Sequence, residues 1–348
     1  MATKTFVHLQ FVISVLYLCA VSSAQPATPN YQLVTTIPVP GGLAGFDIAW
    51  IEPSNQRLYL TDRTTKKGTG RIDVIDTQNN KFLYTIPTNQ SEIAFTGNTP
   101  AATPGCTISG PNGVVAIPQM NQLYVGDGDS TVKVVDLAAR AVVAIIPTGG
   151  SCRADELAYD PLDHIIMIAN PSDKPPFLTF ISADTQSVLG TYTYPSTQAG
   201  LEQPVWNPLT RRFYISVPAT STTLGSLDVF NPTTMMREQS ITTSACSPAG
   251  LVLSPAQHLM TSCGVVIDAT NGNLLTATQG VNTDELWYNP GDNRYYFGAP
   301  SNSVVDANTN QVIATFPSTA GHTLAVDPIN NRVFAPASGV GIKVFAAQ

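Results

Sequence analysis

The chain has 348 residues, of which only 12% are charged, and its formal net charge is −7. No basic run is present that would neutralise a phosphate backbone, which argues against a nucleic-acid partner. Thr, Val, Asn, Pro and Gly are plentiful while Lys and Glu are few, which favours strands joined by turns over helices.

The first 24 residues have the layout of a secretory signal peptide. Lys4 precedes the apolar run FVISVLYLCAV and the small residues SSA follow it, so we expect cleavage after Ala24. No other stretch approaches the roughly 18 apolar residues that a membrane span needs. We therefore expect residues 25–348 to form a single domain, without a membrane span, that is secreted or lies in the lumen of the secretory pathway, as a monomer.

Four cysteines lie beyond the expected signal peptide, and an oxidising compartment favours two disulfides over free thiols. Cys246 and Cys263 lie symmetrically about the turn SPAQH, so a hairpin centred there places them opposite each other. Elimination then pairs Cys106 with Cys152. Metal binding by these cysteines is the alternative, but the sequence has no C-x-x-C pair.

A strand followed by a proline recurs seven times along the chain. The copies are FDIAWIEP, NGVVAIP, DELAYDP, EQPVWNP, AGLVLSP, DELWYNP and HTLAVDP, which end at Pro53, Pro118, Pro161, Pro208, Pro255, Pro290 and Pro328. A polar turn, a second strand and a third strand follow each proline. Six copies also have a fourth strand, whereas the seventh lacks one and a matching strand precedes the first copy at residues 31–40.

This repeat predicts an all-β fold, namely a seven-bladed β-propeller of four-stranded antiparallel blades. Residues 31–40 are expected to close the ring as the missing strand of the last blade, because closure removes the exposed edges of an open array. The wide spacing between Pro53 and Pro118 predicts an insertion between the first two blades, at residues 88–109. This insertion contains Cys106 and the N-glycosylation sequon that begins at Asn89.

A set of polar residues occupies equivalent positions in the repeat, six residues before each proline. The seven positions, which we call the ring positions, are Asp47, Asn112, Asp155, Glu202, Ala249, Asp284 and His322. The first strand of a propeller blade is the innermost, so we expect these residues around the mouth of the central channel. Such residues often only bind water or backbone amides of the next blade. Neighbouring carboxylates also shift one another's pKa values, however, as happens at functional sites, so we expect a ligand site here.

Further charged residues are expected on the same face of the ring. Arg153 stands two positions before Asp155, where it would pair with Asp155 or Glu202, or hold an oxyanion. Glu156 follows Asp155, and loops after second strands contribute Arg63 and Asp127. We expect no cofactor, although the carboxylates of four ring positions are ligands that an axial Ca²⁺ accepts: Asp47, Asp155, Glu202 and Asp284.

The innermost strands also contain all three tryptophans, Trp50, Trp206 and Trp287, together with Tyr159. Aromatic residues at these positions either pack blade against blade or form an apolar wall for a hydrophobic ligand. The sequence lacks G-x-S-x-G, H-E-x-x-H, Walker and strand-linked G-x-G-x-x-G motifs. It therefore gives no sign of a common hydrolase, zinc protease or nucleotide-binding site.

The segment LYVGDGDSTVKVVDL resembles the repeat of YVTN-type and YncE-like β-propellers. The segments GPNGVV, RADELAYDP, EQPVWNP, CSPAGL and GHTLAVDP are similar to a subgroup of secreted bacterial and fungal members. This resemblance covers essentially the whole chain after the signal peptide. It implies the fold, whereas the repeat itself is shared by unrelated activities.

The sequence is also similar to the fungal hetero-Diels–Alderases of tropolone–sesquiterpene biosynthesis. That resemblance implies a pocket that takes a hydroxymethyl-tropolone-like precursor, assists loss of water to an ortho-quinone methide, and holds a macrocyclic alkene such as humulene for [4+2] addition. From their placement, the residues expected to be catalytic are Arg153, Asp155, Glu202, Asp284 and His322. Those expected to bind substrate are Asp47, Asn112, Arg63, Glu156 and Asp127.

Two other functions stay open. Muconate-type lactonases share the seven-bladed architecture and use a His, Glu and Arg set on the channel face, for which this chain offers His322, Glu202 and Arg153. Non-catalytic binding of a small molecule or a cell-surface partner also fits the acidic surface.

Overall fold

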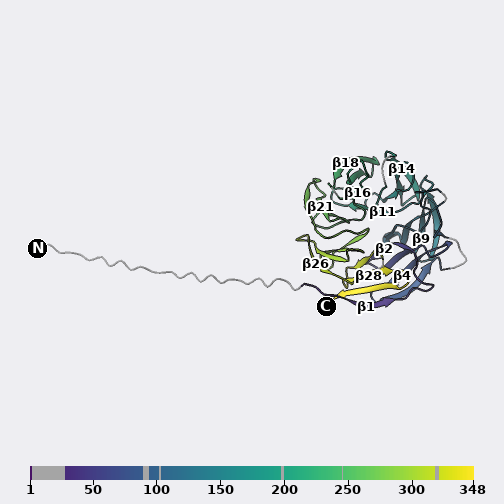
Figure 1. The fold of residues 1–348 in the computed structure, drawn as a ribbon. Coiled ribbons are helices and arrows are strands. Elements are labelled where there is room, and N and C mark those ends of the chain that lie inside the picture. The colour runs from purple at the N-terminus through teal and green to yellow at the C-terminus, as the bar shows by residue number, and fades with distance from the viewer. Residues whose placement is uncertain (2–27, 89–93, 102, 197–199, 245, 318–320) are drawn as a thin grey trace.

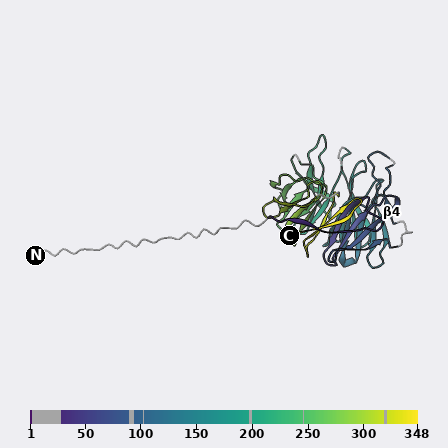
Figure 2. The same ribbon diagram turned by 60° about the horizontal axis from the view of Figure 1, so that its bottom comes forward.

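The computed structural model describes residues 1, 28–88, 94–101, 103–196, 200–244, 246–317 and 321–348 (Figure 1). The expected signal peptide beyond residue 1 and the sequon at Asn89 lie outside these residues. The described strands form seven antiparallel sheets around a common centre, which confirms the seven-bladed β-propeller (Figure 1). Figure 2 shows the same ring after a 60° turn, with connecting loops rising from one of its faces.

The blades follow one another in chain order, and the first strand of each is the innermost. Blade 1 contains β2 (Phe46–Glu52), β3 (Arg57–Asp62), β4 (Lys67–Asp76) and β5 (Lys81–Ile86); blade 2 contains β7 (Val114–Ile117), β8 (Gln122–Asp127), β9 (Thr131–Asp136) and β10 (Ala141–Pro147); blade 3 contains β11 (Leu157–Asp160), β12 (Ile165–Asn170), β13 (Phe177–Ser182) and β14 (Ser187–Thr193); blade 4 contains β15 (Pro204–Asn207), β16 (Arg212–Val217), β17 (Ser226–Asn231) and β18 (Met236–Thr242).

The remaining three blades have the same order. Blade 5 contains β19 (Leu251–Leu253), β20 (His258–Thr261), β21 (Val265–Asp268) and β22 (Leu274–Ala277); blade 6 contains β23 (Leu286–Asn289), β24 (Arg294–Phe297), β25 (Ser303–Asp306) and β26 (Gln311–Thr315); blade 7 contains β27 (Ala325–Asp327), β28 (Arg332–Ala337), β29 (Gly341–Ala347) and β1 (Tyr31–Ile37). Within the described residues the helical structure is one 3₁₀ turn, Pro118–Met120, and no helix has the length and apolar character of a membrane span.

Strand β1 closes the ring, as predicted. It pairs antiparallel with β29, from Tyr31 opposite Ala347 to Ile37 opposite Ile342. The strand ends at Ile37, before the expected limit of residue 40, because Pro38 and Pro40 cannot donate backbone hydrogen bonds to a sheet. The outer strand of blade 7 therefore comes from one end of the described domain and its other three strands from the opposite end.

The repeated proline marks a tight turn from the innermost strand to the second strand. Three residues after the proline, or two in blade 5, the backbone is left-handed, with φ between 52° and 65°, at Gln56, Asn121, His164, Arg211, Gln257, Asn293 and Asn331. A turn that ends in a left-handed residue is a common connection in β-hairpins. We call the face of the propeller that carries these seven turns the turn face.

The insertion between blades 1 and 2 contributes a short extra strand. Strand β6 (Phe95–Gly97) pairs with β4 and extends blade 1 to five strands. The core lies between neighbouring blades, where buried aliphatic and aromatic residues from the two facing sheets pack together, as Phe180 of blade 3 does against Phe213 and Phe230 of blade 4. This packing holds the innermost strands around the channel.

Candidate functional site in the central channel

Residues far apart in the sequence meet at the ring positions. Arg63 of blade 1 forms an ion pair with Asp47, and its Nε donates to Oδ1 of Asn112 in blade 2 at 3.0 Å. On the other side of Asp47, Nε2 of His322 in blade 7 lies 3.2 Å from Oδ1. Three adjacent blades are therefore joined through the Asp47 carboxylate and the Arg63 guanidinium.

Arg153 forms the second ion pair of this face. Its Nη2 lies 2.6 Å from Oδ2 of Asp155, and its Nη1 lies 3.9 Å from Oδ2 of Asp47. The backbone N–H of Arg153 donates to the carbonyl of Thr107 at 2.7 Å, so the insertion helps to hold this arginine. Of the two partners expected for Arg153, Asp155 is the one that it contacts.

The acids of the ring positions differ in their protonation. Burial opposes ionisation of Asp47, but Arg63 and the hydrogen bond from His322 outweigh it and lower the pKa of Asp47 to about 2. Burial raises the pKa of Asp155 to about 6, against the effect of Arg153. Burial and the nearby Asp155 raise the pKa of Glu202 to about 8. The site therefore holds ionised and neutral acids side by side at neutral pH.

The remaining ring positions contribute less to this network. Burial lowers the pKa of His322, but the hydrogen bond to Asp47 and the charge of Asp47 outweigh it, so the net shift is upward. Asp284 is exposed, and Ala249 has no polar side chain. Most of the ion pairs and hydrogen bonds among the ring positions therefore lie on the side formed by blades 7, 1, 2 and 3.

A second pair of acids lies directly below the ring, towards the turn face. Glu156 and Glu285 are both buried and lie near enough to affect each other's pKa. Burial raises both pKa values well above the usual range, and each acid disfavours ionisation of its neighbours. The buried Oε2 of Glu156 has no hydrogen-bond partner in the described part of the chain.

Glu285 was missed as a candidate residue by the sequence reasoning. The sequence did contain a pattern that could have identified it, because Glu285 and Glu156 are the second acids of the two Asp-Glu-Leu triplets. The repeat placed them at equivalent positions in blades 3 and 6. It did not show that two blades on opposite sides of the channel bring these side chains together.

A cavity of about 410 Å³ lies between this acid pair and the turn face. The innermost strands of blades 1 to 6 line it, and Glu156 is the one charged residue among the described residues of its wall. Trp50, Trp206, Trp287 and Tyr159 all contribute to the wall, and Trp50 and Trp287 also contact each other edge to face, with centroids 5.8 Å apart. The innermost aromatic residues thus serve both of the roles considered, packing and cavity wall.

Asp127 is placed differently from the other candidates. Its carboxylate accepts hydrogen bonds from the backbone N–H and the hydroxyl of Thr96 in β6 and lies 3.6 Å from Nζ of Lys133. No hydrogen bond or ion pair joins its side chain to a ring position within the described residues. Its side chain therefore anchors the insertion to blade 2, and we do not assign it to the channel site.

Both predicted disulfides are present. Cys106 is bonded to Cys152, with a Cα–Cα distance of 5.1 Å, and Cys246 is bonded to Cys263, with 5.9 Å. Cys152 and Cys246 each stand three residues before a ring position, so each disulfide holds a segment that leads into an innermost strand.

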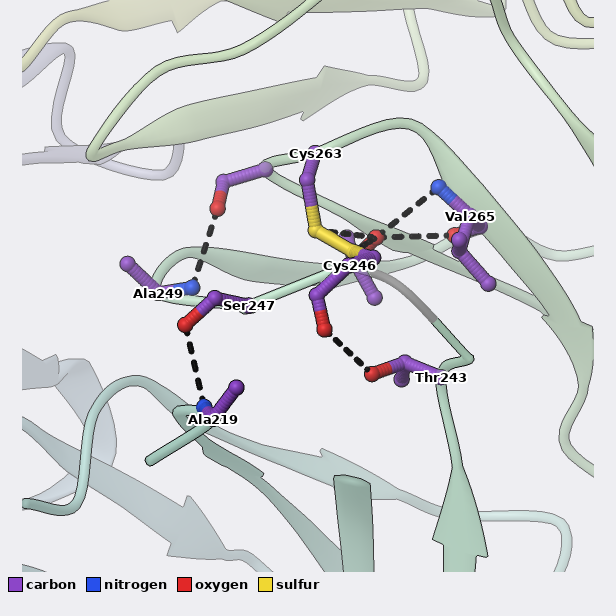
Figure 3. Close-up of a disulfide and its surroundings, with 9 residues drawn as sticks. Ala219, Thr243, Cys246, Ser247, Ala249, Cys263 and Val265 are labelled. Atoms are coloured by element: carbon purple, nitrogen blue, oxygen red, sulfur yellow. Dashed lines mark hydrogen bonds between the residues drawn. A yellow bond between two sulfur atoms is a disulfide. The ribbon is translucent and has the colours of Figure 1, made fainter. Parts of the chain in front are cut away.

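The surroundings of the second disulfide show how this segment is held (Figure 3). The Thr243 hydroxyl donates to the carbonyl of Cys246 at 3.0 Å, and the backbone N–H of Ala249 donates to the Ser262 hydroxyl at 3.0 Å (Figure 3). The disulfide and these hydrogen bonds position the start of β19.

The ring positions do not fit an axial Ca²⁺. In the described residues no three His, Cys, Asp or Glu side chains are arranged to hold a metal ion. Asp47 and Asp155, two of the four acids considered, are paired with Arg63 and Arg153, which compete with a cation for their oxygens.

Comparison with known proteins establishes the fold alone. No family model and no curated protein matches the chain. Among solved structures, a chain of the crystal structure of the mitotic checkpoint complex is similar, with 12% identity and a TM-score of 0.66 over 97% of this chain and 99% of that chain. In all, 1305 chains in solved structures match, so the fold does not discriminate between functions.

Proposed function

We propose that the protein is a small-molecule enzyme of the secretory pathway that binds a hydrophobic substrate in the central cavity and moves protons through the Glu156–Glu285 pair. We further propose that its reaction is a cyclisation of the hetero-Diels–Alder type, in which a tropolone quinone methide adds to a sesquiterpene alkene. The observation that carries the proposal is an aromatic, apolar cavity whose wall has one charged residue among the described ones, the buried Glu156, whose pKa is raised by burial and by Glu285. The two disulfides support a location in the secretory pathway, because disulfides persist in oxidising compartments.

The acid pair has the properties that a 1,4-elimination of water requires. In that step the protonated member of the pair donates its proton to the departing hydroxyl of the hydroxymethyl group, and the C–O bond breaks. The ionised member accepts the proton of the ring hydroxyl, so that water and a neutral ortho-quinone methide are formed without net oxidation. A pair that shares one proton can do both, because it contains an acid and a base.

The cavity wall suits the second step. The quinone methide then adds to the alkene in a [4+2] reaction that needs no proton transfer, so the protein contributes orientation and the exclusion of water. Flat aromatic side chains such as Trp50, Trp206 and Trp287 offer surfaces on which an apolar partner packs. Water would capture the quinone methide and end the reaction, so an apolar wall favours the addition.

The ring positions lie beyond Glu156 and would act on the polar end of the substrate through their charge. Arg153 is held beside Asp155 and Asp47 and keeps its positive charge, because these acids raise its pKa against the effect of burial. Its buried Nε has no hydrogen-bond partner in the described residues. A cation at this position would stabilise negative charge that develops on the tropolone oxygens.

A lactonase is the second candidate, because of one specific contact. His322 lies 3.2 Å from the Asp47 carboxylate, as a general-base histidine often lies beside the acid that orients it. Arg153 and Glu202 belong to the same face. Ring opening of a lactone that is lost in His322→Ala and retained in Glu156→Gln would favour this candidate over the cyclase.

The deciding experiment mixes the purified protein with a hydroxymethyl-tropolone precursor and humulene. We expect an adduct of defined configuration, formed faster than without protein, and a large loss of rate in Glu156→Gln. Glu238→Gln, on the exposed outer strand of blade 4, is the matched control and should keep full activity. Racemic product at the uncatalysed rate would contradict the cyclase, and binding without any conversion would indicate a non-catalytic ligand-binding propeller.

A further inference from the structure

The two ends of the central cavity differ in polarity and in burial. Towards the ring positions, the cavity ends at Glu156, which is 6% exposed, and beyond it lies Asp155, which is 2% exposed and paired with Arg153. Towards the turn face, the residues that line the cavity include Pro161, which is exposed to solvent. The cavity is thus blocked by buried acids at one end and reaches solvent at the other.

The turn face carries exposed apolar side chains directly after the repeated proline. Leu162 follows Pro161 and is 51% exposed, and Leu209 follows Pro208 and is 66% exposed. The same position in blade 7 is Ile329, which is 59% exposed. We call these three residues the apolar rim. Single exposed apolar residues are common, but three at one equivalent position around a channel form a pattern that solubility does not explain.

The rim follows the cavity wall directly along the chain at blades 3 and 4. Pro161 lines the cavity next to Leu162 in the chain, and Trp206 lines it three residues before Leu209. A ligand that moves from the rim to Glu156 contacts aromatic and aliphatic side chains along the whole path. A ligand that comes from the other side has to separate the Arg153–Asp155 ion pair, which leaves buried charges without partners, and then pass the buried Glu156.

We infer that neutral hydrophobic ligands enter the cavity through the turn face, across Leu162 and Leu209, and that their polar end advances to Glu156. The hydrocarbon part of the ligand then remains between Trp206, Tyr159 and the rim. This inference rests on the cavity of the proposed function and is independent of the reaction that takes place in it. It also predicts the order of binding for a two-substrate reaction, with the polar reactant first and the hydrocarbon second.

The test measures how fast a neutral apolar fluorophore, N-phenyl-1-naphthylamine, binds to the full domain in stopped-flow experiments. Leu209→Cys is labelled with a bulky maleimide to obstruct the rim, and Leu162→Cys is a second, independent variant. The matched control is Ala44→Cys with the same label, because Ala44 is exposed and stands three residues before the ring position Asp47. Mass spectrometry of each product shows that one label is attached and that both disulfides remain.

We expect the labels at Leu209 and Leu162 to slow association by about tenfold or more, while the label at Ala44 changes it less than about twofold. Equal slowing at both faces, slowing at Ala44 alone, unchanged rates in all variants, or no binding of the fluorophore to the unlabelled protein would each overturn the inference. If the fluorophore results agree with the inference while no cyclisation is found, the access route stands and the proposed function fails.

Discussion

Glu156 and Glu285 occupy the same position in two Asp-Glu-Leu triplets of blades 3 and 6, and both are buried, with Glu156 in the wall of the cavity. Burial raises the pKa of both carboxyl groups, and the charge of Glu285 raises that of Glu156 further. This relationship makes the pair the strongest candidate for proton transfer in the channel.

The pair leads to a prediction about the pH dependence of activity. We expect the rate to fall as pH rises and the pair loses its proton. Glu285→Gln removes a negative charge that disfavours ionisation of Glu156, so the pKa of Glu156 decreases and the alkaline fall moves to lower pH. A pH–rate profile of the two proteins checks this shift. A fall at the same pH in both proteins would show that the pair does not control the rate.

Glu202 leads to a prediction about stability. Burial and Asp155 raise its pKa from the ordinary 4.5 to about 8, so the folded state holds this proton more tightly than the unfolded state does. The resulting stabilisation is complete below about pH 4.5 and is lost as pH rises through about 8. In Glu202→Gln the free energy of unfolding should decrease less over this interval, as urea denaturation at several pH values measures. Equal slopes for both proteins would contradict the raised pKa.

The closure of the ring can be tested at Tyr31. Its hydroxyl lies 2.8 Å from that of Tyr296 in blade 6 and accepts from Nη1 of Arg294 at 3.0 Å. Tyr31→Phe removes both hydrogen bonds, while Tyr296 and Arg294 keep their bonds to Asp292, so we expect a loss of about 1 kcal/mol in the free energy of unfolding. Tyr192→Phe, which removes a hydroxyl from a half-buried ring of blade 3, is the control. Equal losses in both variants would argue against a closing role.

The two disulfides should differ in their effect on activity. In the chain-entropy model, removal of Cys106–Cys152 costs about 4 kcal/mol and removal of Cys246–Cys263 about 3 kcal/mol, so both double Ser variants and the reduced protein should melt at lower temperature. Only the first disulfide ties the insertion to the segment that carries Arg153. At a temperature where all variants are folded, Cys106→Ser/Cys152→Ser should therefore lose more activity. An unchanged melting temperature would contradict the stabilising role.

The ring positions show which contacts of the candidate site could be predicted from the sequence. A side chain six residues before the repeated proline had to lie near the axis once the fold was a propeller, and Asp47, Asn112, Asp155 and His322 do meet there. Arg63 was found by the same argument, because the loop after a second strand reaches the same face. The argument failed for Asp127, whose loop is covered by β6, since an insertion has no place in a periodic pattern.

The sequence by itself determined the number of blades, the strand of each blade that faces the channel, the ring closure by β1 and the pairing of the cysteines. These features depend on period, turn chemistry and chain order, which are local properties of the sequence. Only the tertiary structure decided which residues of one layer lie close together, such as Glu156 with Glu285 or Arg153 with Asp155, and which end of the cavity is blocked. Contacts across a channel depend on the rotation of each blade about the axis and on the reach of each side chain, and these quantities are set by the packing of all seven blades together.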